Sequence, residues 1–119
     1  MINTLLLIIV IICLALGQVL FKRAGLTMQG QPIPGAFLTL ATQPGFYLAL
    51  AIYGFATLLW TWVLSRLPLS QAYPWVAVTS VIVPLLGWLA FGERLTLLFW
   101  IGMGFILIGL LLTQQATAP

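Results

Sequence analysis

Long apolar runs alternate with short polar breaks along the whole chain. Four runs, at residues 2–21, 46–67, 70–91 and 96–113, are each close to the length that a helix needs to cross the hydrocarbon core of a bilayer. The charged side chains fall at or beyond the ends of these runs. A lone span must satisfy its backbone hydrogen bonds internally, so each run is predicted to be a helix. The pattern predicts one domain over residues 1–119, an all-α membrane protein with four transmembrane helices.

The connections between the predicted helices differ in length. Residues 67–70 and 91–96 form tight turns, whereas the first connection runs from 22 to 45. That connection contains GQPIPG at 30–35, which breaks any helix. The stretch at 36–43 that follows fits either a short interfacial helix or an ordered surface loop.

The amino-acid composition excludes several classes of function. The chain has 119 residues, of which 63% are hydrophobic and 4% are charged, whereas a soluble domain has about a quarter charged residues. There is no histidine, one cysteine and one acidic residue, Glu93. A metal site, a paired-carboxylate enzyme and a Ser–His–Asp triad are therefore excluded within one subunit, and no cofactor is implied. No basic cluster exceeds two residues, which excludes nucleic-acid binding.

The distribution of basic residues weakly predicts how the chain is oriented in the membrane. Lys22, Arg23 and Arg94 lie on the side shared by the first and third connections, and Arg66 lies on the other side. The excess favours the first and third connections in the cytoplasm.

Polar and small residues recur on one face of three predicted helices. Residues four apart share a helix face. Gln18 and Lys22 line up in the first helix, Tyr53, Thr57 and Thr61 in the second, and Ser80 belongs to a small-residue face of the third. We expect these faces to turn inward, either to pack against one another or to line a cavity.

Other residues have candidate roles in movement and assembly. Pro84 removes a hydrogen bond in mid-helix and is predicted to be a hinge. Tyr73 and Trp75, beside Pro74, fit either an interfacial aromatic belt or a substrate gate. Gly102 and Gly109 share a face of the last helix and are predicted dimer contacts.

Three motifs resemble the drug/metabolite transporter superfamily in its four-helix form. They are GQVLFKRAG at 17–25, VLSRLPLSQAYP at 63–74, and LAFGERLTLLFWIGMGFILIGLLL at 89–112. The resemblance implies an EmrE-like, dimeric bundle. Small multidrug resistance proteins carry an essential first-helix glutamate, and its place here is taken by Leu14. Their paired third-helix glycines fall on Val78 and Ser80.

A second branch, the ArnE/ArnF type, is more similar. It shares GQ followed by a basic residue at the end of the first helix, and LP-x-x-x-AYP at 67–74. Glu93, in FGERLT, also matches a common position of the wider EamA-like group. This resemblance implies a flippase subunit for undecaprenyl phosphate aminoarabinose or a similar lipid-linked sugar, in a bacterial inner membrane, as a homodimer or with a paralogous subunit.

A charge-free span suits a cargo whose lipid tail stays in the bilayer while its head crosses. Lys22 and Arg23 are placed to meet the phosphate, and Arg66 to act from the opposite side. The predicted substrate-binding residues are Gln18, Lys22, Arg23, Tyr53, Thr57, Trp60, Thr61, Arg66, Tyr73, Trp75 and Ser80.

Two alternatives stay open. One is a small multidrug resistance-type exporter of organic cations, for which Glu93 is the one available proton acceptor. The other is a non-transporting membrane interaction subunit. Glu93 itself is expected to cap the N-terminus of the fourth helix, where negative charge is favoured.

Overall fold

The computed structural model describes residues 2–116 and shows helices joined by short connections, with no strand among those residues. The helices are α1 (Ile2–Leu26), α2 (Ile33–Ala41), α3 (Pro44–Leu64), α4 (Leu69–Val76), α5 (Thr79–Phe91) and α6 (Leu97–Ala116).

Four helical stretches are long and apolar enough to span a membrane: α1, α3, α4 together with α5, and α6. The predicted all-α class with four transmembrane helices is therefore confirmed for the described part of the chain. The chain is a multi-pass membrane protein.

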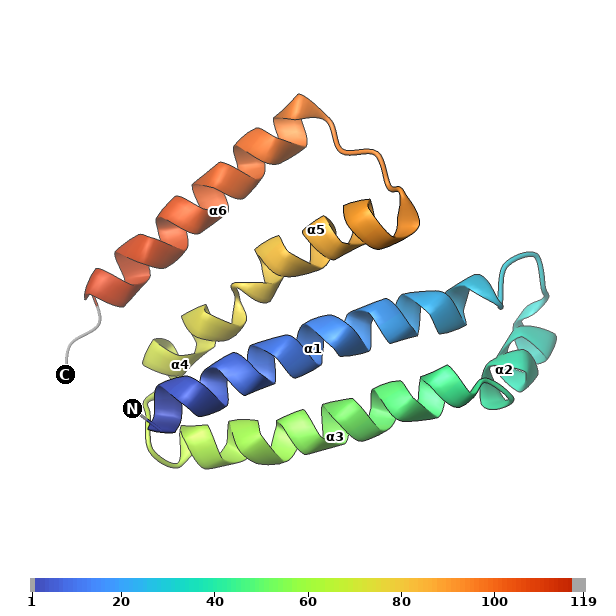
Figure 1. The fold of residues 1–119 in the computed structure, drawn as a ribbon, viewed down its shortest axis with the longest axis horizontal. Helices are drawn as coiled ribbons and strands as arrows, with labels where there is room; N and C mark the ends of the chain where they lie inside the picture. The colour runs from blue at the N-terminus through green and yellow to red at the C-terminus, as the bar shows by residue number, and fades with distance from the viewer. Residues whose placement is uncertain (1, 117–119) are drawn as a thin grey trace.

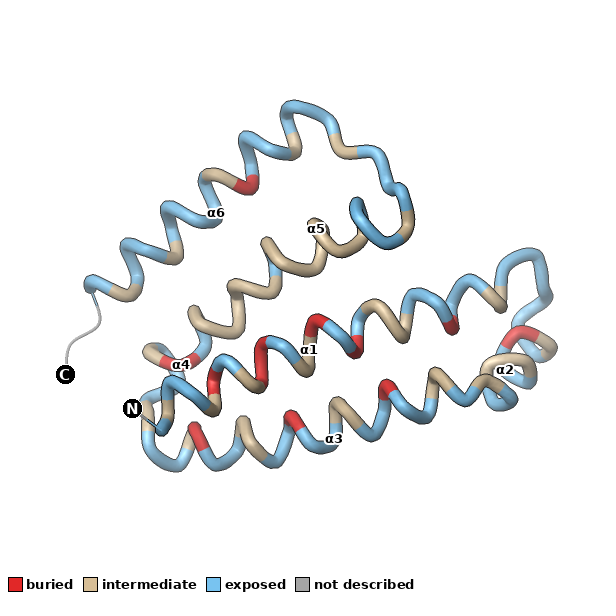
Figure 2. The backbone as a smooth tube through the Cα atoms, viewed as in Figure 1, coloured by how far each residue is buried: buried red, intermediate tan, exposed pale blue. Residues whose placement is uncertain are grey.

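Helix α1 lies at the centre of the bundle. It packs most extensively on α3, and α4 and α5 lie along its other side (Figure 1). Helix α6 diverges from α5 and approaches the rest of the chain mainly near α4. Figure 2 shows that most buried positions lie along α1 and α3, while α6 is largely exposed.

Small residues make the α1–α3 contact close. Buried positions recur every seven residues on both helices, at Val10, Gly17 and Ala24 on α1 and at Ala49, Ala56 and Val63 on α3. Without a strong hydrophobic drive inside lipid, helices associate through such small residues, which let the two backbones approach. A seven-residue repeat keeps one stripe of each helix facing its partner over several turns.

Gly17 is the point of closest approach. A Cβ added there would overlap the ring of Tyr53 on α3. The Tyr53 ring also makes an edge contact with Phe21, with centroids 5.1 Å apart. The absence of a side chain at Gly17 therefore leaves the space that the Tyr53 ring occupies.

The third span is interrupted between α4 and α5. At residues 77–78 the α-helical hydrogen bonding gives way to tighter bonds, from Val78 N–H to Trp75 O (3.1 Å) and from Ser80 N–H to Ala77 O (2.9 Å). Pro84 lies downstream, within α5, and α5 continues through it. The ring of a helical proline crowds the carbonyl four residues earlier, which here belongs to Ser80. The span is thus irregular from 77 to 80, just before the predicted hinge.

The first connection begins later than the sequence indicated, because α1 continues past Lys22 and Arg23 to Leu26. The Thr27 hydroxyl donates to Ala24 O (2.6 Å) at the helix end, and Gly30 turns the chain with a φ of 76°. Of the two alternatives for residues 36–43, the short helix is the one observed, over 36–41 as part of α2. The prediction that GQPIPG at 30–35 breaks any helix was wrong for its second half, because α2 begins at Ile33, where Pro34 fits the first helical turn.

We expect Gly17→Ala to destabilise the protein by about 1–3 kcal/mol, the usual cost of overpacking a close contact. The new methyl group would displace Tyr53 and open the α1–α3 contact. Gly54→Ala is the matched control, because nothing lies within 4 Å of a Cβ added there. Thermal unfolding in detergent, followed by circular dichroism, measures both variants; equal melting temperatures would contradict this account of the contact.

Candidate functional site

A continuous hollow runs between α1, α3 and α5. It has two parts, of about 380 and 330 Å³, which share Gln18, Val83 and Pro84 as lining residues. We call this hollow the central groove. Its polar lining comprises Gln18, Lys22, Tyr53, Thr79, Ser80 and Glu93, and its apolar lining comprises Leu14, Val19, Val83, Pro84, Phe91, Leu95 and Phe99, with Gly87 at its floor.

Gln18 has a partner across the α1–α3 contact. Its side-chain Nε2 donates to the Tyr53 hydroxyl, which lies 3.5 Å from Leu14 O. The Gln18 amide nitrogen and the phenol thus lie together where the two parts of the central groove meet. The seating of Tyr53 against Gly17 holds this pair in place.

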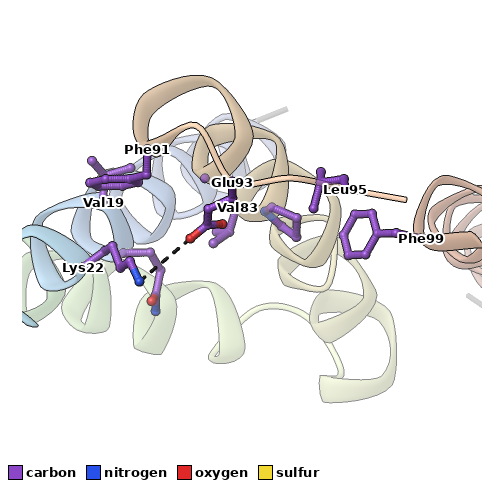
Figure 3. Close-up of a pocket in the computed structure, with 10 residues that line it drawn as sticks. Val19, Lys22, Val83, Phe91, Glu93, Leu95 and Phe99 are labelled. Atoms are coloured by element: carbon purple, nitrogen blue, oxygen red, sulfur yellow. Dashed lines mark ion pairs between the residues drawn. The ribbon is translucent and has the colours of Figure 1, made fainter. Parts of the chain in front are cut away.

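Lys22 and Glu93 meet at one end of the central groove. Lys22 Nζ lies 3.9 Å from Glu93 Oε2, and the two side chains are 48% and 45% exposed (Figure 3). Lys22 comes from α1, one turn beyond Gln18, whereas Glu93 comes from the connection between α5 and α6. The pair therefore joins two parts of the chain that are far apart in sequence.

The expectation that Glu93 caps the fourth helix was wrong. Helix α6 begins at Leu97, and the side chain at its start that accepts a backbone hydrogen bond is Thr96, from Phe99 N–H (3.3 Å). Gly92, with a φ of 67°, turns the chain after α5, and Glu93 N–H lies 3.4 Å from Gly87 O. The Glu93 carboxylate consequently points back toward α1.

Gly87 makes room for that carboxylate. A Cβ added to Gly87 would overlap Glu93 Oε1. The carboxylate thus rests directly on the backbone of α5, with Phe91, Leu95 and Phe99 among the other lining residues (Figure 3).

The threonine stripe of α3 is largely satisfied within its own helix. The Thr57 hydroxyl donates to Tyr53 O and the Thr61 hydroxyl to Thr57 O, both at 2.8 Å. Thr57 also lines a smaller hollow of about 110 Å³ with Trp60 and Tyr73, which adjoins the central groove at Leu14.

The remaining predicted site residues lie outside the central groove. Arg66 stacks on Trp62, with its guanidinium carbon 4.7 Å from the ring centroid. Arg23 is exposed in the last turn of α1. Trp75 packs against the core cluster around Leu7 and lines an apolar hollow against α6. Gly102 and Gly109 are exposed, with open space around both.

The structure thus brings together five predicted residues, Gln18, Lys22, Tyr53, Ser80 and Pro84, in the central groove. Sequence reasoning placed Glu93 elsewhere, although a signal was present. The predicted topology put Lys22 and the 91–96 turn on the same side of the membrane, and Glu93 is the chain's one acidic side chain. A basic and an acidic residue at the same membrane face can be expected to form an ion pair.

The comparisons with known proteins agree along nearly the whole chain. The model of the EamA-like transporter family matches residues 1–114. The chain is 36% identical over 108 residues to a protein of Aeromonas salmonicida (strain A449), covering 89% of this chain and 93% of that protein. It is 37% identical over 110 residues to one of Pectobacterium atrosepticum, covering 91% and 96%, and 34% identical over 112 residues to one of Proteus mirabilis, covering 92% and 95%.

All three relatives are named as the probable 4-amino-4-deoxy-L-arabinose-phosphoundecaprenol flippase subunit ArnE. No solved structure matches the chain significantly. The resemblance stated from the motifs at 17–25, 63–74 and 89–112 is confirmed. With four helices able to span a membrane and a family match over residues 1–114, this chain belongs to the EamA-like transporter family.

Proposed function

We propose that the chain is a subunit of a flippase that moves a polyprenyl-phosphate-linked amino sugar across the bacterial inner membrane. The names of the relatives support this cargo. The observation that carries the proposal is the central groove, which combines a polar lining with apolar walls and lies among helices able to span a membrane.

The lining of the central groove suits a ligand with a polar head and an apolar tail. Lys22 supplies a cation that can make a charge-assisted hydrogen bond to the phosphate. Gln18, Tyr53 and Ser80 supply donors and acceptors for sugar hydroxyls. The tail stays in the lipid beside the groove, so the protein has to carry the head alone.

The middle of α1 supports a flippase over a proton-coupled exporter. Leu14 lines the central groove at the position where the small multidrug resistance pattern has its glutamate. A leucine exchanges no proton, and Glu93 lies at the end of the groove, paired with Lys22. Export of organic cations would have to use Glu93, and this alternative is an outcome of the test below.

A second subunit fits the exposed state of α6. Most of its large apolar side chains are exposed, including Phe105 at 70% and Leu111 at 64%. Gly102 and Gly109 are seven residues apart on this helix and have free space around them. Small residues spaced in this way let a second helix approach, so we propose that they contact either another copy or a paralogous subunit.

Transport should depend on the head-group side chains of the central groove. We expect Lys22→Gln to lower the flipping rate about tenfold or more, because a hydrogen bond to a charged group contributes about 1.5–3 kcal/mol. Gln18→Leu should lower it severalfold, since a neutral hydrogen bond contributes about 1 kcal/mol. Thr61→Val is the control and should leave the rate unchanged, because that hydroxyl bonds its own helix.

The rate is measured on right-side-out inner-membrane vesicles, with an amine-reactive reagent that does not cross the bilayer and therefore labels the amino sugar only after it reaches the outer face. Wild-type transport that requires a proton gradient and accepts organic cations would replace this proposal with the exporter. Full activity in both Lys22→Gln and Gln18→Leu would favour an interaction subunit.

Native mass spectrometry of the gently released protein should show a dimer that retains a polyprenyl-phosphate species. Gly102→Leu and Gly109→Leu should shift the protein toward monomer, because the larger side chains separate the two helices. Gly104→Leu lies on the opposite face of α6 and serves as the control. A dimer that persists in both glycine variants would place the interface elsewhere.

A further inference from the structure

We propose that Glu93 recognises the amino group of the cargo and selects amino sugars over neutral sugars, an inference that rests on the proposed function. The cargo in the names of the relatives, 4-amino-4-deoxy-L-arabinose-phosphoundecaprenol, has an amine and a phosphate, which carry charges of opposite sign. The central groove offers one side chain of each matching sign, Lys22 and Glu93, at the same end.

The chain has a single acidic residue that could bind the amine of the cargo. Glu93 is the one acidic residue among 119, against four basic residues. An ammonium group taken out of water needs a carboxylate or comparable acceptor to offset its lost hydration. In this chain, the carboxylate that can meet that need lies in the central groove and not on a distant surface.

The Lys22–Glu93 ion pair is weak enough for a ligand to separate its two side chains. Its atoms are 3.9 Å apart, at the outer limit of an ion pair, and both side chains are about half exposed. Such exposed pairs contribute little to stability. A zwitterionic head group could therefore replace one internal pair with two external ones, phosphate on Lys22 and ammonium on Glu93, each a charge-assisted hydrogen bond.

The backbone around Glu93 holds the carboxylate ready for a ligand. Gly92 turns the chain back after α5, and Gly87 leaves the space in which the carboxylate lies. Preorganisation of this kind lowers the ordering cost of binding. When a bound head group displaces the water around this half-exposed pair, the apolar lining, with Val83, Phe91 and Phe99, lowers the local dielectric and strengthens the interaction between charges.

Selectivity arises because a neutral sugar would leave the Glu93 carboxylate without a positively charged partner. Its phosphate would take Lys22 away from Glu93, and its hydroxyl would not replace the lost positive charge. A bound neutral head group would also displace water from the half-exposed carboxylate and leave it without a counter-charge, which penalises the wrong ligand. The empty groove avoids this penalty because Lys22 and Glu93 neutralise each other.

The test uses the full-length protein in nanodiscs, with any subunit that copurifies, and two short-chain polyprenyl phosphate sugars that differ only in a 4-amino or a 4-hydroxy group. Affinity for each lipid is measured by microscale thermophoresis. Wild type should bind the 4-amino lipid about tenfold more tightly. Glu93→Gln should abolish this preference, because it weakens binding of the 4-amino lipid and removes the penalty on the 4-hydroxy lipid, whereas Lys22→Gln should weaken binding of both lipids.

Gly87→Ala provides a second variant that keeps the carboxylate but moves it. The added methyl group meets the flexible end of Glu93, so the side chain can shift while the helix stays intact. We expect Gly87→Ala to reduce the preference and Gly54→Ala, which meets open space, to retain it. Retained binding of the 4-hydroxy lipid shows that the Glu93→Gln, Gly87→Ala and Gly54→Ala variants are folded.

The outcomes separate the inference from the function on which it rests. If wild type binds both lipids equally, or Glu93→Gln keeps the preference for the 4-amino lipid, this inference is overturned while the flippase proposal stands. If wild type binds neither lipid, both fall.

Discussion

The close contact between α1 and α3 is the constraint on which the rest of the site depends. In lipid, apolar side chains gain little by leaving one apolar surface for another, so close packing must supply the association energy. The buried stripes, with Gly17 on one helix and Ala49 and Ala56 on the other, provide it. Because Tyr53 lies against Gly17, this contact also positions the phenol oxygen that accepts the hydrogen bond from the Gln18 amide. The packing of α1 on α3 therefore also determines the geometry of the central groove.

The electrostatics of the central groove are concentrated at one end. Lys22 and Glu93 stand near the end of α1 and in the α5–α6 connection, while the middle of the groove is lined by neutral groups such as Gln18, Tyr53 and Ser80. A charge held at mid-membrane is costly, whereas one near a helix end can reach the interface. This distribution fits the proposed cargo, whose charged head would meet Lys22 and Glu93 at one end of the groove and neutral hydrogen-bonding groups further along it.

The helices could be predicted from sequence because a run of about 20 apolar residues has few alternatives in a bilayer. The role of Gln18 was partly predictable, since its amide needs a partner that its own helix does not supply. The threonine face of α3 was harder to interpret. Periodicity gives the face on which Thr57 and Thr61 lie, but not that their hydroxyls bond the preceding turn. The position of Glu93 depends on the left-handed turn at Gly92 and the bare backbone at Gly87, which are tertiary features.

Helix α6 touches its own chain over little of its length, and among its residues Met103 is the buried one in the described structure. Its place in the membrane is therefore set less by its own chain than by what lies beside it. Without a neighbour along that face, α6 would be the membrane-spanning helix least restrained by its own chain.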